Sequence, residues 1–396
     1  MKNRKKILFV HPGEQDHPSG GGNVAAWLLE GLREDYEITI LTWKPFDFRE
    51  INRYYGTSLC DDEFETLVPP ALLRYLIDLI PRDPWKFQRL SLLMRFCKII
   101  GHHYDILMSS CNEIDFGRRG IQYVHYPYLR EIWEKEPNGV LLQGMTGYLL
   151  KWINSRIRPW RIVSGFSFER MRENLSIVNS EWTGRVFEEV YNSKHITVYP
   201  PVPGHFTDIP WTQKEEGFVC VGRLSGEKRW EEIIDIIGEV RKSFPELHLH
   251  IIGSAVNYQK QYYRRLKRKV GENSGWVFLS EDLSRTELVE EICRHKYGIH
   301  ARPDEHFGIS VAEMVRGGCI VFVPDDGGQT EIVGNDKRLL FHTQKDALDR
   351  ILFVLKNPDE QRSLSRQLAS KRTFFTPKKF VAEIRQIIDG FVRGLF

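Results

Sequence analysis

The sequence predicts an α/β protein with two doubly wound, Rossmann-like domains, each a parallel sheet covered by helices on both faces. Its 396 residues are too many for one ordinary hydrophobic core. Short apolar runs alternate with amphipathic helical patterns along the chain, an order that produces parallel sheets. A stretch rich in Pro and Gly interrupts the alternation at 201–216. We therefore expect an N-terminal domain over 1–200, a linker over 201–216 and a C-terminal domain over 217–376.

The expected strands are short apolar runs, and the expected helices repeat apolar residues every three to four positions. In the first half the strands are expected at 5–12, 36–43, 104–110, 121–127, 175–180 and 195–201, with helices at 24–32 and 181–191. In the second half they are expected at 217–224, 247–254, 275–281, 297–302 and 319–324, with helices at 230–244, 285–295 and 377–396.

Composition indicates a soluble globular protein whose bulk charge favours no particular partner. Hydrophobic residues make up 41% of the chain, charged residues 28%, and the net charge is +3. No apolar run reaches the length of about 18 residues that a spanning helix needs. The opening MKNRKKILFV has an apolar part of only Ile7 to Val10, which indicates a first strand rather than a signal peptide.

The six cysteines lie far apart and form no CxxC pair. This spacing argues against a zinc site and predicts reduced, buried thiols. We therefore expect a cytoplasmic protein.

Three consecutive glycines, Gly20, Gly21 and Gly22, stand before a helical pattern and suggest a phosphate site. With Ala25 they match the spacing of the dinucleotide fingerprint. However, the strand that should supply a ribose-binding acid ends LTWK, without a carboxylate, and no GK[ST] follows the glycines. The missing acid argues against a nicotinamide site, and the missing GK[ST] argues against a P-loop. What stays open is an anion held by N–H groups at a helix N-terminus, or a plain surface turn.

Glu305 and Glu313 flank the expected start of a helix at Gly308 and Ile309. A rise of about 1.5 Å per residue puts the two carboxylates roughly 8–12 Å apart, which suits a nucleotide sugar better than a shared proton or metal ion. One acid can reach the transferred sugar and the other the ribose hydroxyls, while N–H groups at the helix start meet phosphate oxygens. The alternative is an ordinary helix-end and an ordinary helix-surface carboxylate.

Arg223 and Lys228 follow a predicted strand in VGRLSGEKRW. Because ligands of such sheets bind beyond the carboxyl ends of the strands, we expect both cations to face the site of Glu305. There they can neutralise a leaving diphosphate as its charge grows; solvated loop charge is the alternative. Gly327 and Gly328, after a later strand, permit close backbone approach.

In order and spacing, GRLSGEK, DEHFGISVAEM and GGQTEIV resemble the nucleotide-sugar site of the family 4 glycosyltransferases, retaining enzymes of the two-domain GT-B fold. SGGG, VHYP, VNSEWT and VYPPV extend the resemblance over nearly the whole chain. VHYP and EHFGI are similar to the cytoplasmic α-1,2-mannosyltransferases that extend dolichol-linked oligosaccharides. The resemblance implies two domains facing across a cleft, and a helix over 377–396 that bridges back to the N-terminal domain.

The resemblance also implies a role for each matching residue. Arg223 and Lys228 would bind the diphosphate and stabilise it as leaving group. Glu305 would orient the donor sugar, and His125 would be a catalytic residue that projects toward it. Further nucleotide-sugar contacts would come from Gly21, Gly22, Phe307, Gly308, Ile309 and, through the ribose, Glu313.

The implied reaction moves a hexose, with mannose favoured, from a nucleotide sugar to a glycan or lipid-linked acceptor with retention. We expect GDP-mannose as the donor, a UDP-sugar as the alternative, and no required cofactor or metal ion. The leaving diphosphate would take the acceptor proton, so no side-chain base is needed. The rival hypotheses are nucleotide-sugar epimerisation or hydrolysis on the same fold and non-catalytic sugar binding.

Two stretches depart from the family pattern. Asp325 and Asp326 would repel a diphosphate unless they turn away or bind a cation. Residues 128–175 carry no family motif, so the acceptor does not follow from the resemblance.

Two basic, apolar segments, 71–100 and 148–166, resemble helices that lie on an anionic membrane surface. The alternative is ordinary packing on the first domain with the cations reaching solvent. A basic segment at 257–270 predicts a solvated helix face, and nothing else supports nucleic acid binding. Because both alternatives remain for the first two segments, the sequence leaves open a peripheral contact of the protein with the inner face of a membrane. The cations of the first segment are Arg74, Arg82, Lys86, Arg89, Arg95 and Lys98.

Overall fold

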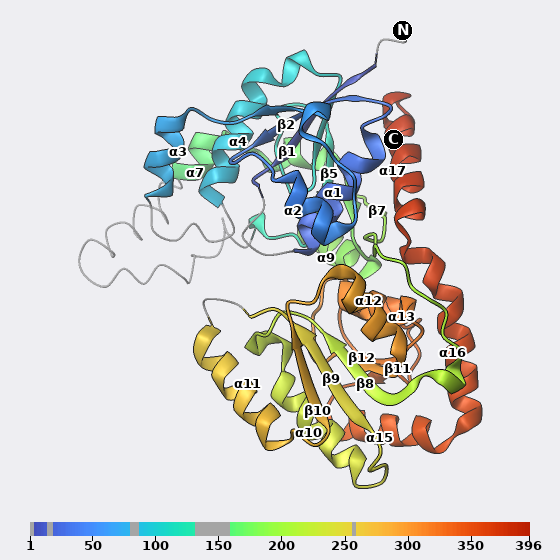
Figure 1. Cartoon of the computed structure of the whole chain (residues 1–396). Helices are drawn as coiled ribbons and strands as arrows, with labels where there is room; N and C mark the ends of the chain where they lie inside the picture. The colour runs from blue at the N-terminus through green and yellow to red at the C-terminus, as the bar shows by residue number, and fades with distance from the viewer. Residues whose placement is uncertain (1–3, 14–18, 80–86, 131–158, 256–258) are drawn as a thin grey trace. The chain divides into compact units, whose positions relative to one another are not determined.

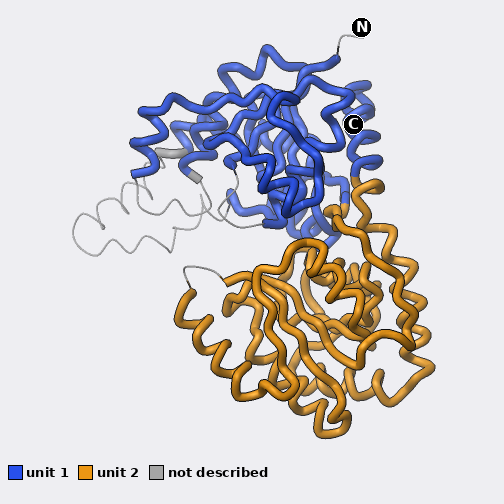
Figure 2. Tube along the Cα trace, in the orientation of Figure 1, with its two compact units in different colours: residues 1–198, 381–396 blue, residues 199–380 orange. Residues whose placement is uncertain are grey.

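The structure, a computed structural model, describes residues 4–13, 19–79, 87–130, 159–255 and 259–396 (Figure 1). The chain folds into two compact units (Figure 2). Unit 1 comprises Met1–Val198 and Val381–Phe396, and unit 2 comprises Tyr199–Phe380. The chain therefore passes from one unit to the other twice.

The described part of unit 1 is built on a seven-stranded parallel sheet with the order β3-β2-β1-β4-β5-β6-β7. The order reverses between β1 and β4, as it does in dinucleotide-binding Rossmann folds. Residues Ile7 to Val10 of β1, an interior strand, are almost fully buried, as expected for a strand covered on both faces. The strands are β1 Lys6–His11, β2 Glu37–Thr42, β3 Glu65–Leu67, β4 Ile106–Ser109, β5 Ile121–Val124, β6 Leu175–Val178 and β7 Ile196–Thr197.

Helices cover this sheet, and one of them returns from the far end of the sequence. Val381 of that helix, α17, packs over Gly31 of α1, and the Arg385 Nε donates to the Gly31 carbonyl at 2.7 Å. The helices are α1 Gly20–Leu32, α2 Phe48–Tyr55, α3 Ala71–Asp78, α4 Phe87–Ile100, α7 Pro159–Ser164, α8 Phe168–Arg172, α9 Glu181–Tyr191 and α17 Pro377–Val392.

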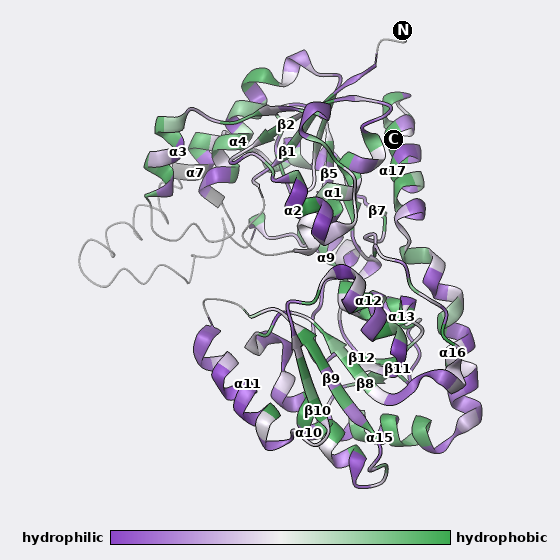
Figure 3. Ribbon diagram, viewed as in Figure 1, coloured by the Kyte–Doolittle hydropathy of each residue, from purple (hydrophilic) through white to green (hydrophobic). Residues whose placement is uncertain are grey.

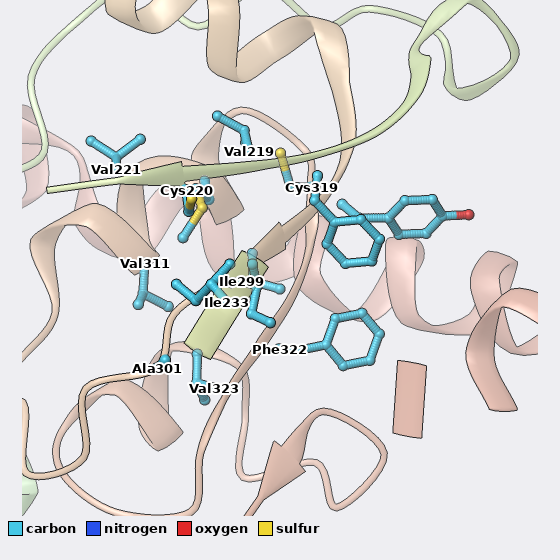
Figure 4. Close-up of a cluster of buried hydrophobic side chains, with 14 of the residues drawn as sticks. Val219, Cys220, Val221, Ile233, Ile299, Ala301, Val311, Cys319, Phe322 and Val323 are labelled. Atoms are coloured by element: carbon cyan, nitrogen blue, oxygen red, sulfur yellow. The ribbon is translucent and has the colours of Figure 1, made fainter. Parts of the chain in front are cut away.

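Unit 2 repeats the architecture with a six-stranded parallel sheet, in the order β10-β9-β8-β11-β12-β13. Its strands are β8 Glu215–Val221, β9 His248–Gly253, β10 Val277–Glu281, β11 His295–Ile299, β12 Ile320–Pro324 and β13 Leu340–Phe341. Its helices are α10 Trp230–Arg241, α11 Lys260–Glu272, α12 Arg285–Arg294, α13 Ile309–Arg316, α14 Gln329–Ile332, α15 Gln344–Lys356 and α16 Pro358–Lys371. Side chains from β8, β11 and β12 meet those of α10 and α13 in the core (Figure 4).

The predicted α/β class with two parallel sheets is confirmed, and each run expected to be a strand is one. β3 and β13 were not expected, because each is too short to leave an apolar pattern in the sequence. Gly20, Gly21 and Gly22 form the first turn of α1 rather than a loop before it. The Ser19 side chain caps this turn by accepting from the Gly22 N–H at 3.0 Å.

The stretch 201–216, expected to be a linker, belongs to unit 2. Val202 is fully buried in the core of that unit. The buried Lys214 ammonium donates to the carbonyls of His295 and Gly317, at 3.3 and 2.8 Å. These contacts explain why an aperiodic, Pro-rich sequence is nevertheless fixed.

All four cations of the first basic segment that the structure describes bind protein groups instead of forming a free basic face. Arg74 donates to the Pro69 carbonyl at 3.0 Å. Arg89 pairs with Asp78, Arg95 donates to the Val163 carbonyl, and Lys98 pairs with the buried Asp115. Arg82 and Lys86, and residues 148–158 of the second segment, lie outside the described residues. Among the residues that are described, no helix is long and apolar enough to cross a membrane.

The basic helix α11 is hydrophilic over most of its length (Figure 3). Only Tyr262 and Leu266 are buried, while Lys267 and Lys269 pair with Glu281 and Asp235. It is therefore a solvated face with paired charges, as the sequence predicts.

We predict that Asp115→Ala destabilises unit 1 strongly. The Asp115 carboxylate is fully buried and accepts from Lys98 and Arg170, both at 2.8 Å. Burial alone would raise the pKa of Asp115, but these two cations lower it. Breaking such a pair leaves a partly buried ammonium without its partner, at roughly 3–5 kcal/mol of unfolding free energy. Urea unfolding measures the loss; Asp35→Ala, which removes an exposed partner of Arg385, should change it by less than about 1 kcal/mol.

Candidate functional site

The candidate site lies at the carboxyl edge of the unit 2 sheet, in the loops that follow β8, β11 and β12. β8 and β11 are neighbours at the point where the strand order reverses. Open α/β sheets bind ligands at this edge, because loops diverge there to opposite faces. Lys228 follows β8 and Glu305 follows β11, so the topology brings these predicted residues together.

Lys228 and Glu305 form a nearly buried ion pair, with 2.7 Å between Lys228 Nζ and Glu305 Oε2. Their side chains are 10% and 18% exposed. The His300 Nε2, from the end of β11, lies 3.2 Å from the same carboxylate oxygen. Glu305 is thus bound by two side chains, Lys228 after β8 and His300 after β11.

The environment fixes the charges of these groups. Burial alone would raise the pKa of Glu305, but the Lys228 charge and the His300 hydrogen bond hold it well below its usual value of 4.5. Burial and the nearby Lys228 charge lower the pKa of His300, so its ring is neutral and its Nε2–H donates to Glu305. At neutral pH the site holds one carboxylate, one ammonium and one neutral imidazole.

Arg223, the other predicted cation, is half exposed and pairs with Glu227 at 2.6 Å. Arg302 connects the two ion pairs, because its guanidinium lies 3.8 Å from Glu227 and 4.0 Å from Glu305. Arg223, Glu227, Arg302, Glu305 and Lys228 therefore form one line of alternating charges. The Asp304 carboxylate also lies 3.7 Å from the Arg302 guanidinium, so the cluster holds three cations and three carboxylates. Arg223, Lys228 and Arg302 are the groups in it that can bind an anionic ligand.

The third loop packs directly on the backbone of Glu305. The Gly328 N–H donates to the Glu305 carbonyl at 2.8 Å, and a Cβ on Gly327 would lie 2.4 Å from that oxygen. Gly327 also has φ +81°, so the position requires glycine twice over. Asp326 accepts from the Gly327 N–H at 2.7 Å, and Asp325 lies 3.3 Å from His342. Both aspartates thus have partners within unit 2.

Glu313 occupies the second turn of α13, as expected, but its carboxylate binds Arg285. The same guanidinium donates to the Pro203 carbonyl. A ribose hydroxyl at Glu313 would therefore have to compete with a partly buried ion pair. The sequence offered no sign of this partner, since Arg285 begins a different helix.

The residues around the start of α13 divide between core and site. The Phe307 ring is buried against Tyr199 and Phe375, so only its backbone is available to a ligand. Gly308 caps α13 with φ +101°, a conformation that glycine adopts without strain, and Ile309 begins the helix. These N–H groups stand next to Glu305 in the chain.

In unit 1, His125 and Gly21 lie against each other. A Cβ on Gly21 would be 3.6 Å from the His125 Nε2, and that nitrogen lies 3.0 Å from the Ser110 carbonyl. A carbonyl only accepts, so Nε2 carries the hydrogen. Burial lowers the pKa of His125 to about 4, which keeps the ring neutral. Gly22 follows in the same turn, where its N–H is bound by Ser19.

Sequence reasoning missed four groups at this site: His300, Arg302, Glu227 and Gln329. The Gln329 amide donates to the carbonyls of Arg302 and Asp326, at 2.9 and 3.0 Å, and its Oε1 has no partner among the described residues. A signal existed for His300 and Arg302, which stand at a strand end just before Glu305 in HARPDEHF. Gln329 left none.

Comparison with known proteins identifies the part of the chain that holds this site. Residues 204–371 match the family Glycosyl transferases group 1. Unit 2 contains a group 1 glycosyltransferase domain. Lys228, Glu305 and the third loop all lie within this group 1 domain.

Curated relatives match about half of the chain. The Caenorhabditis elegans GDP-Man:Man(3)GlcNAc(2)-PP-Dol alpha-1,2-mannosyltransferase is 23% identical over 50% of this chain and 47% of its own length. The Homo sapiens protein of the same name is 27% identical over 49% of this chain and 43% of its own length. The matched region is thus less than half of either relative.

Solved structures share the fold of the whole chain. Anabaena HepE in complex with UDP has a TM-score of 0.66 at 14% identity, covering 97% of this chain and 100% of its own. WaaG, a glycosyltransferase of lipopolysaccharide biosynthesis, has a TM-score of 0.64 at 12% identity over 95% of this chain and 98% of its own. The pneumococcal O-GlcNAc transferase GtfA has a TM-score of 0.64 at 11% identity over 98% and 99%. The predicted GT-B fold is confirmed.

We predict that Glu305 makes the stability of the group 1 domain depend on pH. Because its pKa is lowered in the folded state, the carboxylate stabilises the fold above about pH 4.5 and loses that contribution as the pH falls further. Glu305→Gln should therefore lower the unfolding free energy by up to about 3 kcal/mol at pH 7, and the difference from wild type should shrink below pH 4.5.

Urea unfolding at several pH values measures this difference. The control is Glu239→Gln, which removes an exposed partner of Lys242. Equal pH profiles for wild type and Glu305→Gln would show that the Lys228 pair is not formed in solution.

Proposed function

We propose that the protein is a retaining hexosyltransferase that moves mannose from GDP-mannose to a lipid-linked glycan. The observation that carries the proposal is the Lys228–Glu305 pair at the switch point of a group 1 domain. The names of the curated relatives support mannose, GDP and a dolichol-linked acceptor. Structures of HepE and GtfA hold UDP, which keeps a UDP-sugar as the alternative donor.

The proposed chemistry exchanges partners within the ion pair. A bound diphosphate offers Lys228 a new anion, and Glu305 is released to accept hydrogen bonds from the donor sugar. As the bond from C1 to the phosphate oxygen breaks, Lys228 and Arg223 stabilise the negative charge that grows on the leaving diphosphate. The acceptor oxygen bonds to C1 on the same face, and its proton passes to the departing phosphate oxygen. No side-chain base is required.

The remaining roles follow the resemblance, with one addition from the geometry. N–H groups from Phe307 to Ile309 meet the phosphate and sugar, and Glu313 meets the ribose once Arg285 yields it. His125, neutral and next to Gly21, contacts the sugar as a hydrogen-bond donor or acceptor. Arg302 adds a third cation for the diphosphate, since it already lies between two carboxylates.

We predict that Arg223→Ala lowers turnover by about two to three orders of magnitude, because it removes a cation that stabilises the leaving group. Arg223 is the best position of the site to vary, since its side chain is half exposed and its partner Glu227 keeps the Arg302 guanidinium at 3.8 Å when Arg223 is removed. Mannosyl transfer from GDP-mannose to a synthetic lipid-linked glycan measures the effect. Lys242→Ala, which removes an exposed cation of the same unit, should keep wild-type turnover.

A thermal-shift series with GDP-mannose, UDP-glucose and UDP-N-acetylglucosamine identifies the donor, since a ligand of the native state raises its Tm. Glu305→Gln should keep the shift and lose transfer. Wild-type turnover in Arg223→Ala, or no shift with any of the three donors, would refute the proposal. Release of free mannose without an acceptor would favour the hydrolase alternative.

We further propose that unit 1 contacts a membrane through α3. This helix has no buried residue, and Leu72, Tyr75, Leu76 and Leu79 are 52–72% exposed. Soluble proteins seldom leave such a cluster uncovered. Ile162 of α7 is also exposed. A surface of this kind suits an enzyme whose acceptor is anchored in lipid.

We predict that Leu72→Glu together with Leu76→Glu lowers binding to vesicles containing anionic phospholipid by at least tenfold, because it places charge where apolar side chains would enter the lipid. Vesicle co-sedimentation measures the binding. Leu395→Glu is the matched control, since Leu395 is 71% exposed elsewhere on unit 1. Equal loss in the control would show that binding is not localised to α3.

A further inference from the structure

A second cluster of ionisable side chains lies at the opposite, amino end of the unit 2 sheet. Glu215, His248 and His295 are the first residues of β8, β9 and β11. These strands are neighbours, with β8 in the middle (Figure 1). The register pairs His295 with Glu215, and His248 with Gly217 two residues further along β8. The sheet itself therefore brings the three side chains together.

The potential ligand atoms already have the spacing of a metal site. His248 Nε2 lies 3.1 Å from His295 Nε2 and 3.4 Å from Glu215 Oε2. All three atoms lie within 4.8 Å of one another. A tetrahedral zinc ion with bonds of about 2.0–2.1 Å keeps its ligand atoms roughly 3.3 Å apart.

The hydrogen bonds of His295 leave the correct nitrogen available. Its Nδ1 lies 2.7 Å from the Glu291 carbonyl, which only accepts, so Nδ1 carries the hydrogen. The Nε2 lone pair then points toward His248. Metal-binding histidines use this arrangement, in which a backbone carbonyl fixes the ring and its tautomer. Burial lowers the pKa of His295 to about 3 and also lowers that of His248, so both rings are neutral at pH 7.

Arg294 holds the Glu215 carboxylate so that one of its oxygens also faces the other two ligands. Arg294 binds Oε1 at 2.8 Å and leaves Oε2 on the side of His248. A metal ion at this position would meet an oriented carboxylate, and would require only that His248 move its hydrogen from Nε2 to Nδ1.

The cluster also has room for the His248 ring and an opening to solvent. A Cβ on Gly217 would lie 2.3 Å from the His248 ring, so glycine at this position makes room for the imidazole. Glu215 and His248 line an open hollow of about 710 Å³, through which an ion and a fourth ligand from water can enter. His250 and Glu291 line the same hollow. With His295 they form an overlapping group of possible ligands.

We propose that Glu215, His248 and His295 bind a divalent transition-metal ion of the zinc class. Two imidazoles and one carboxylate suit Zn²⁺, whereas Mg²⁺ and Ca²⁺ prefer oxygen ligands. The ion ties together the amino ends of three strands. Its place is at the end of the sheet opposite to Lys228 and Glu305, so its role is to stabilise unit 2 rather than to take part in sugar transfer.

Zinc titration of the whole chain, after treatment with a chelator, tests the proposal. Calorimetry measures the binding, and the Tm measures the gain in stability. Wild type should bind one equivalent of zinc, and its Tm should rise. Replacing a residue behind the ligands commonly weakens metal binding 10- to 100-fold, so Glu215→Gln and His248→Gln, which each remove a ligand, should weaken it by at least about 100-fold. Both side chains are partly exposed, 38% and 21%, so these variants are expected to fold.

His102→Gln is the matched control, because His102 lies in an exposed pair with His103 on unit 1. It should bind as wild type does. Co²⁺ in place of Zn²⁺ should give the intense visible absorption of a tetrahedral site in wild type and in His102→Gln, but not in Glu215→Gln or His248→Gln. Wild-type affinity in Glu215→Gln, or a loss confined to His250→Gln or His102→Gln, would overturn the proposal. None of these measurements involves a nucleotide sugar, so they stand or fall separately from the proposed transferase.

Discussion

The contact between Lys228 and Glu305 joins the two loops that leave the unit 2 sheet at its switch point. Both side chains are nearly buried, and the Lys228 charge and the His300 hydrogen bond lower the pKa of Glu305 against the effect of burial. Together they form a charged site that is already in place before any ligand arrives. In the proposed transferase, a diphosphate and a sugar would replace these internal contacts, so that little reorganisation would be needed during the reaction.

The two ends of the unit 2 sheet use ionisable groups in opposite ways. At the carboxyl end, Lys228 and the His300 hydrogen bond keep Glu305 charged, and the proposed ligand is an anion. At the amino end, burial keeps His248 and His295 neutral, and their lone pairs suit a cation. One parallel sheet thus presents two chemically distinct surfaces, separated by the length of its strands.

The parts of the structure that follow local rules could be predicted from the sequence. Strand–helix alternation predicted both sheets, and topology placed Lys228 and Glu305 at one edge. Partners from distant elements could not be predicted, because they leave no pattern in the sequence. Arg285 at Glu313, Arg302 between two carboxylates, and the protein partners of Arg95 and Lys98 are of this kind. All six cysteines are free thiols, and four of them are buried as expected, whereas Cys60 is exposed. They carried no information about histidines on three separate strands.

The path of α17 sets an order on folding during synthesis. Val381 and Arg385 complete the packing around Gly31 of α1, yet about 350 residues, including all of unit 2, are translated between them. Unit 2 is contiguous in the sequence and can fold as soon as it leaves the ribosome. The surface of α1 that contacts Val381 stays uncovered until α17 has been translated. While translation continues, the nascent first unit therefore leaves this surface of α1 exposed, and incompletely covered units of this kind are prone to aggregate.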